Sequence, residues 1–161
     1  MAKAGVVSAR LSDRWREAAP LAYIDFFRAE PAARIQMVKA GIGARVMKRL
    51  VSDLDVDQKV FFPALNISIA TVNRKALRNE ALAPDEGERV VGVAKLVGQL
   101  EAIVEESGDP VGFDAKAWIS RWLLEPLPAL GNRRPLDLLD TMEGQTMVSN
   151  ALAQVQSGAY A

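Results

Sequence analysis

The sequence predicts an all-α protein in which a helix-turn-helix domain precedes a small three-helix domain. Apolar residues recur at spacings of three and four along most of the 161-residue chain. Ser, Asp, Thr or Pro stands where such runs begin, and Gly or Pro stands where they end. Half of the residues are hydrophobic, which is enough to bury a core. We expect an N-terminal arm and first helix in residues 1–28, the helix-turn-helix domain in 29–107 and the second domain in 112–161.

Two helices are expected in residues 31–54. Pro31 begins the first, which runs through Val38 and is ended by Gly41 and Gly43. The second places four apolar residues on one helical face, namely Val46, Leu50, Val51 and Leu54.

A short helix is expected next. Asp55 and Gln58 have the spacing of a capping box, which would open it. Its inward-facing residues would be Val60, Phe61, Ala64 and Leu65. Pro63 within this helix either ends its first turn or kinks it.

The segment after this helix has the layout of a helix-turn-helix. Asn66 tolerates the left-handed conformation that a tight turn between helices requires. Ser68 is a good N-cap for a helix from Ile69 to about Asn79. The inner face of that helix would consist of Val72, Ala76 and Leu77.

The second helix of this motif is the candidate DNA-binding element. It would lie in the major groove of operator DNA, with its N-terminal amides against phosphate. The residues expected to reach phosphates or base edges are Ser68, Thr71, Asn73, Arg74, Lys75 and Arg78. The alternative is that these polar residues only solvate an exposed helix face.

A long helix is expected to begin at Pro84. Pro at the first helical position and the acidic Asp85 and Glu86 in the first turn suit the exposed amides there. The helix carries an apolar seam of Val90, Val93, Val97, Leu100 and Val104. This seam is either a dimer interface, since helix-turn-helix proteins usually act in pairs, or part of the chain's own core. Its short length favours the core.

The clearest boundary is the run Ser107-Gly108-Asp109-Pro110, because Gly ends a helix and Pro prevents it from resuming. Asp114 then caps a helix with Trp118, Trp122 and Leu123 on one face, which Pro126 and Pro128 end. The two tryptophans are either core residues, which we favour, or part of a binding surface.

A loop and two further helices complete the chain. Residues 130–134 form the loop, and Pro135 begins a short helix with Leu136, Leu138 and Leu139. Thr141 caps the last helix, Gly158 ends it, and its apolar face consists of Val148, Ala151, Leu152 and Val155. Three short helices bury too little surface to be stable alone. We therefore expect them to dock on the first half, on a second copy or on a partner.

The composition argues against catalysis. The chain has no Cys and no His, which excludes disulfides, thiol nucleophiles, His general bases and the usual zinc sites. No spacing of carboxylates singles out a metal-binding pair. We expect no enzyme activity, no metal and no cofactor. No apolar run approaches the length of a membrane span and no signal peptide is recognisable, so we expect a cytoplasmic protein.

Charge is unevenly distributed along the chain. Residues 1–100 hold 16 Lys and Arg against 11 Asp and Glu, whereas residues 101–161 hold 4 against 9. A basic half suits an anionic partner and an acidic half suits a different one, although an asymmetry of this size also arises by chance.

The second half resembles the toxin-binding domain of the Xre/MbcA/ParS-like antitoxins. The family pattern is a Trp-Leu pair, a Pro, Leu-Gly-Gly, Pro-x-x-Leu-Leu-x-Thr, a Gly and a final helix ending near Gly-x-x-Ala. Here it becomes Trp122-Leu123, Pro126, Leu130-Gly131-Asn132, Pro135 to Thr141, Gly144 and Gly158 to Ala161. Asn132 replaces the second glycine of the pattern, and Asn also tolerates the left-handed conformation.

The first half resembles the Xre-like helix-turn-helix domain more loosely. The matching runs are Leu65-Asn66-Ile67-Ser68-x-x-Thr71 and Pro84-x-Glu86-x-x-Arg89. Asn66 stands where the family often has Gly, and Ala83 stands where it often has a Ser cap.

This resemblance implies the antitoxin of a type II toxin–antitoxin pair. The partner would be a RES-domain toxin that attacks NAD or transfers ADP-ribose from it. The antitoxin would bind and neutralise the toxin, insert its C-terminus into the NAD pocket, and repress the shared promoter, with a homodimer inside a larger complex. Carried over, the toxin-binding residues are Trp122, Leu123, Leu130, Gly131, Asn132, Arg133, Arg134, Pro135, Leu139, Thr141, Gly144, Gly158, Tyr160 and Ala161.

A second hypothesis stays open from the residues themselves. The chain could be a stand-alone helix-turn-helix transcriptional regulator whose C-terminal helices only dimerise or sense a ligand.

Overall fold

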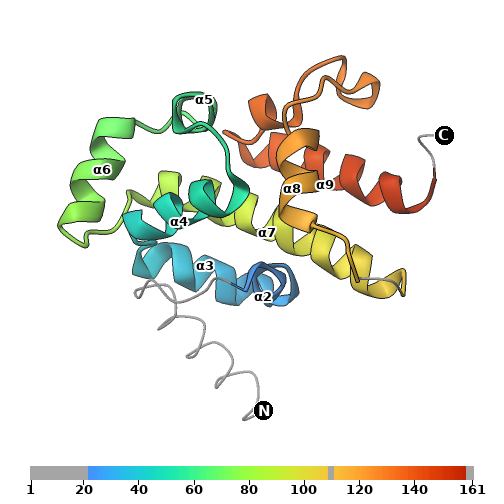
Figure 1. The fold of residues 1–161 in the computed structure, drawn as a ribbon. Coiled ribbons are helices and arrows are strands. Elements are labelled where there is room, and N and C mark those ends of the chain that lie inside the picture. The colour runs from blue at the N-terminus through green and yellow to red at the C-terminus, as the bar shows by residue number, and fades with distance from the viewer. Residues whose placement is uncertain (1–21, 109–110, 159–161) are drawn as a thin grey trace, which may run out of the picture.

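A computed structural model describes residues 22–108 and 111–158, and within them it confirms the all-α fold (Figure 1). These residues form eight α-helices and two short 3-10 helices. In chain order they are α2 (Tyr23–Arg28), α3 (Pro31–Ala40), α4 (Ala44–Leu54), α5 (Gln58–Ala64), α6 (Ile69–Leu77), α7 (Pro84–Glu106), α8 (Ala115–Trp122), η1 (Pro128–Leu130), η2 (Pro135–Leu138) and α9 (Met142–Gln156).

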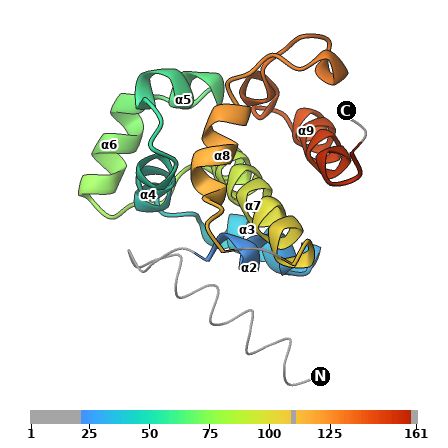
Figure 2. The ribbon, with the colours of Figure 1, turned by 45° about the vertical axis from the view of Figure 1, so that its right-hand side comes forward.

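Helix α7 is the centre of the fold. Helices α2, α3, α4, α8 and α9 all pack against it. Figure 1 shows α5 and α6 near one end of α7 and α9 near the other, and Figure 2 shows α8 lying across it. Val90, Val93 and Val97 are fully buried, and Leu100 is 4% exposed. The apolar seam therefore belongs to the core of the chain itself, which confirms the interpretation favoured above.

Helix α2 approaches α7 closely at one point. A Cβ atom at Gly98 would lie 2.0 Å from the carbonyl oxygen of Tyr23, so a side chain at this position does not fit. The Tyr23 hydroxyl donates a hydrogen bond of 2.6 Å to Asp53, which also pairs with Arg49 at 3.0 Å. Burial and the Asp53 carboxylate raise the pKa of Tyr23. This contact joins α2 to both α7 and α4.

The junction between α4 and α5 differs from the prediction. Asp55 does not open α5; it ends α4 in the left-handed conformation, with φ of 52°. Asp57 is the N-cap, and its carboxylate accepts a hydrogen bond of 2.8 Å from the Lys59 amide. The physical reason is that α4 needs a left-handed residue to turn the chain, and Asp adopts that conformation more readily than most residues.

Two residues assigned to inner faces are exposed. Val60 is 40% exposed in α5, where Phe61, Phe62 and Leu65 fill the core instead. Leu77 is 85% exposed because it lies five residues after the fully buried Val72, which is a rotation of about 140° around the helix. The helix also ends at Leu77, before Asn79, which is left-handed.

The two N-caps predicted for the second half are confirmed, although α8 ends at Trp122, before the prolines expected to end it. Asp114 caps α8 by accepting from the Ala117 amide at 3.1 Å, and Thr141 caps α9 by accepting from the Gly144 amide at 3.0 Å. Both helices pack on α7, so the second half docks on the first. Ile119 and Leu123 are fully buried in α8 and its C-cap, Trp122 is 7% exposed, and Trp118 is half-buried and stacked on Trp122.

The described residues provide neither a membrane span nor a cluster of metal ligands. No helix in residues 22–108 and 111–158 combines the length and the apolar character needed to cross a membrane. The same residues contain no group of three or more acidic side chains placed to hold a metal ion.

Candidate binding surfaces

The turn before α6 is held by its own hydrogen bonds. Asn66 is left-handed, with φ of 55°, and the Ile67 amide donates to the carbonyl of Phe62 at 3.0 Å. Ile67 is 3% exposed and anchors the turn in the core. Ser68 then caps α6 by accepting from the Thr71 amide at 3.3 Å. The Ser cap and the left-handed turn were both predicted, and together they leave the start of α6 at the surface.

The six predicted DNA-binding residues lie together on α6 and at its two ends. Ser68, Arg74 and Arg78 are exposed, and Thr71, Asn73 and Lys75 are half-buried. Within the described part of the chain, the Arg74, Lys75 and Arg78 side chains form no hydrogen bond or ion pair. These three cations are therefore available to an anionic partner.

Helix α4 adds two basic residues to this surface that the sequence analysis did not include. The Lys48 ammonium donates to the Asn73 side-chain oxygen at 2.8 Å, and the Arg45 guanidinium donates to the Ala76 carbonyl at 3.0 Å. Both residues lie on the polar face of α4, opposite the apolar face from which that helix was recognised. Only the packing of α4 against α6 shows that the two polar faces meet.

The loop between α8 and α9 is held by backbone hydrogen bonds. Leu127 and Arg133 form an isolated antiparallel bridge, and the Asn132 amide donates to the Leu127 carbonyl at 2.9 Å. Gly131 and Asn132 are both left-handed, with φ of 67° and 58°. Asn132 therefore adopts the conformation expected of the glycine that it replaces. The loop presents a fixed backbone shape at the surface.

The predicted toxin-binding residues divide by burial. Gly131, Asn132, Arg133, Thr141 and Gly158 are exposed, and Arg134 is half-buried. The buried ones are Trp122, Leu123, Leu130, Pro135, Leu139 and Gly144. Tyr160 and Ala161 lie outside the described residues. The exposed group lies in the 131–134 loop and at the two ends of α9, while most of the buried group belongs to the hydrophobic core.

Gly144 shows why a glycine is needed under this surface. A Cβ atom there would lie 1.7 Å from the carbonyl oxygen of Leu138. Its amide is also the group that the Thr141 hydroxyl caps. The first turn of α9 therefore presses against η2, and only glycine allows that contact.

Arg134 and Asp137 form a two-pronged ion pair. The guanidinium donates to both carboxylate oxygens at 2.8 Å. These hydrogen bonds are the main reason that the pKa of Asp137 lies below its usual value and that of Arg134 above its own. The pair leaves Arg133 as the uncommitted cation of the loop, since none of the described residues bonds to its side chain.

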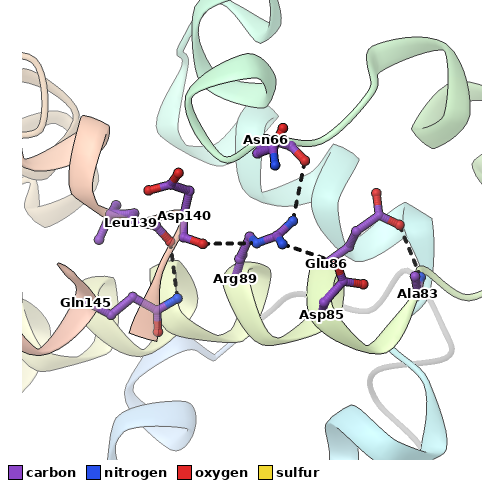
Figure 3. A network of polar contacts seen from close by, with 8 residues as sticks. All are labelled: Asn66, Ala83, Asp85, Glu86, Arg89, Leu139, Asp140 and Gln145. Atoms are coloured by element: carbon purple, nitrogen blue, oxygen red, sulfur yellow. Dashed lines mark hydrogen bonds and ion pairs between the residues drawn. The ribbon is translucent and has the colours of Figure 1, made fainter. Parts of the chain in front are cut away.

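Arg89 of α7 connects the two surfaces (Figure 3). Its Nε donates to the Asp140 carbonyl at 3.1 Å, its Nη1 donates to the Asn66 carbonyl at 3.3 Å, and its Nη2 pairs with Asp85 at 3.1 Å. Asn66 is the turn residue of the helix-turn-helix, and Asp140 directly precedes the cap of α9. One side chain thus holds both turns against the central helix.

Models of two protein families match the chain in succession. Residues 33–95 match the antitoxin Xre-like helix-turn-helix domain, and residues 99–158 match the antitoxin Xre/MbcA/ParS C-terminal toxin-binding domain. The chain belongs to this antitoxin family. The antitoxin resembles a curated protein named Prs ADP-ribosylating antitoxin, from Sphingobium sp. (strain YBL2), with 58% identity over 142 residues, which cover 88% of this chain and 89% of the relative.

Two more distant relatives are named Antitoxin Xre. The protein from Pseudomonas putida is 29% identical over 92 residues, covering 57% of this chain and 52% of its own. The protein from Yersinia enterocolitica is 25% identical over 134 residues, covering 81% of this chain and 85% of its own. These matches confirm the family that the Trp122–Thr141 motif and the helix-turn-helix pattern suggested.

Proposed function

We propose that this antitoxin binds and neutralises an ADP-ribosylating toxin of the RES-domain type. The observation that carries the proposal is the match of residues 99–158 to a toxin-binding domain. The name of the Sphingobium relative associates that protein with ADP-ribosylation of Prs, which supports a toxin of this chemistry as the partner. The antitoxin would act by binding alone and would itself catalyse nothing.

The docking surface would be the exposed loop that η1 and η2 hold in shape. Arg133 is exposed and forms no ion pair with any described residue, so it is free to contact an acidic patch on the toxin. The buried motif residues, such as Leu123, Leu130 and Leu139, would contribute by fixing the loop's backbone rather than by touching the toxin. Preorganisation of this kind reduces the entropy lost on binding.

The C-terminal tail would block the toxin's NAD pocket. Gly158, which follows the C-cap of α9, is left-handed and exposed. The tail that follows carries Tyr160, an aromatic residue of the type that suits a slot for a planar nucleotide. We expect that removal of Ser157–Ala161 weakens inhibition of the toxin more than binding to it.

The helix-turn-helix would repress the promoter shared by the two genes. The three uncommitted cations of α6, joined by Arg45 and Lys48 of α4, give this surface the charge that phosphate binding requires. A homodimer would place two such surfaces on a symmetric operator.

Co-expression with a RES-domain toxin tests the proposal. The full chain should restore growth, and a chain ending at residue 113 should not. Arg133→Glu should weaken toxin binding while Arg74→Glu, a matched reversal of an exposed Arg in the other half, should leave it unchanged. Rescue by the chain that ends at residue 113 would exclude the docking surface and would favour the stand-alone regulator.

A further inference from the structure

A groove lies between α3, α7 and α9, beside the surfaces described above. It consists of two adjoining cavities, one of about 130 Å³ between α7 and α9 and one of about 210 Å³ that also reaches α3. The residues that line both cavities are Gly92, Lys95, Met142 and Gln145. We call this the Lys95 groove.

Lys95 carries a charge that has no counter-ion among the described residues of the groove. Its side chain is half-buried, and none of the described residues forms a hydrogen bond or ion pair with it. Burial, and the neighbouring Arg34, lower the pKa of Lys95. A partly desolvated cation without a counter-ion is unfavourable, so an anion placed here would be stabilised.

The other charged residues of the groove do not satisfy Lys95. Arg34 is a second cation, which has no acceptor for Lys95, and it donates hydrogen bonds to the carbonyls of Phe26 and Phe27 at the end of α2. Glu88 lines the outer cavity, but it is exposed and pairs with neither cation. The groove therefore presents a positive centre to whatever enters it.

The rim of the groove is apolar. Ile35 of α3 and Met142 of α9 are 55% and 59% exposed, and both line the outer cavity. A free small anion would gain nothing from these side chains, whereas a protein segment can place an apolar residue against them beside an acidic one. The groove also adjoins two of the predicted toxin-binding residues, since the buried Leu139 lines the inner cavity and Met142 directly follows the exposed Thr141.

We infer that the Lys95 groove receives an acidic side chain of the toxin. Its carboxylate would pair with the Nζ atom of Lys95, and an apolar neighbour in the toxin would pack between Ile35 and Met142. This inference rests on the proposed function, because the occupant is the same toxin. It adds α3, α7 and the start of α9 to the docking loop of residues 131–134, so the toxin would contact both halves of the antitoxin.

Affinity measurements with the purified toxin test the groove. Lys95→Gln keeps much of the length of the side chain but removes its charge, and it should weaken binding on the order of 10- to 100-fold. Lys95→Arg should retain most of the affinity, because the positive charge is kept. Lys59→Gln is the matched control, since this exposed lysine of α5 lies outside the groove and should leave affinity unchanged.

A second variant tests the groove without changing the half-buried Lys95, whose substitution could disturb the fold. Ile35→Glu changes an exposed side chain, so the fold should persist, but the new carboxylate would repel an incoming acidic residue and weaken binding. Toxin affinity that is unchanged in both Lys95→Gln and Ile35→Glu overturns the inference. Failure of the unaltered antitoxin to bind toxin would instead reject the proposed function.

Titration of the free antitoxin with acetate tests whether the groove binds a small free anion instead of a side chain of the toxin. The side-chain nitrogen signal of Lys95 reports carboxylate binding directly. Saturation by acetate, together with Lys95→Gln leaving toxin affinity unchanged, would assign the groove to a small free anion and overturn the inference. Competition between acetate and toxin would support it.

Discussion

The two halves of the antitoxin place their motif residues in opposite ways. In the helix-turn-helix half, the Arg and Lys residues of α6 extend from the helix surface and form no bonds within the described chain. In the C-terminal half, six of the twelve described residues predicted to bind the toxin are buried, and the exposed ones lie in residues 131–133 and at the two ends of α9. The first set is available for contact with a partner, whereas half of the second set belongs to the folded interior. Substitutions in the second motif should therefore act on the shape of the docking surface before they act on any direct contact.

The strongest way to test this difference is Gly144→Ala. The added Cβ would collide with the Leu138 carbonyl at 1.7 Å, so η2 and α9 would have to move apart. We expect a loss of about 3 kcal/mol or more in the free energy of unfolding, together with loss of toxin binding. Denaturant unfolding and a toxin-binding assay measure the two effects.

Gly131→Ala is the matched control for that substitution. Gly131 is left-handed, but a Cβ atom there would meet nothing within 4 Å. Its cost should be only the conformational penalty of about 1 to 2 kcal/mol. Equal losses from the two alanines would show that the close packing at Gly144 is unimportant.

The contact pattern of the first half is tested by Arg74→Glu combined with Lys75→Glu. Reversing two uncommitted charges should abolish a promoter shift at concentrations that suffice for the unaltered chain, and should lower the salt dependence of binding by about two phosphate contacts. Stability and toxin binding should stay unchanged, because neither side chain bonds within the described chain. An unchanged promoter shift would exclude α6 from DNA binding.

Arg89→Ala tests whether the Arg89 side chain holds the turn at Asn66 and the turn at Asp140 together. It leaves the carbonyls of Asn66 and Asp140 without their donor, which should cost about 1 to 3 kcal/mol. Amide hydrogen exchange should quicken at both turns. The control is Arg28→Ala, which breaks an exposed pair with Glu105 and should cost less than about 1 kcal/mol. Faster exchange confined to α7 would show that Arg89 does not hold the two turns in place.

Local features of the fold were predictable from sequence, and contacts between distant segments were not. Ser68, Asp114 and Thr141 were recognised as caps because capping depends on residues only three positions apart. The left-handed turn at Asn66 follows from the same local chemistry. Asp55 was misassigned because ending one helix and starting the next favour the same residue type, and only the backbone shows which role it takes.

The candidate surfaces show the same limit. The cations of α6 were found from one helix, but Lys48 joins them only through the packing of α4 on α6. The Lys95 groove depends on three helices that are far apart in sequence. Leu77 was assigned to the inner face of α6 because it is apolar and follows Val72 and Ala76 in the pattern. The pattern does not fix how far around the helix the buried face extends, and Leu77 lies beyond it.

The smallest expected effect concerns the Arg134–Asp137 ion pair at the C-terminal end of the docking loop. Hydrogen bonds from Arg134 hold the pKa of Asp137 below its unfolded value, so the pair stabilises the fold at pH values above about 4, and this stabilisation is lost as the pH falls through the lowered pKa. Because both side chains are about two-fifths exposed, Asp137→Asn should cost less than about 1 kcal/mol at neutral pH. The variant should also lose stability less steeply than the unaltered chain below that pH. Unfolding curves across the acidic range measure this, and parallel pH profiles for the two proteins would show that the pair contributes nothing to the stability of this half.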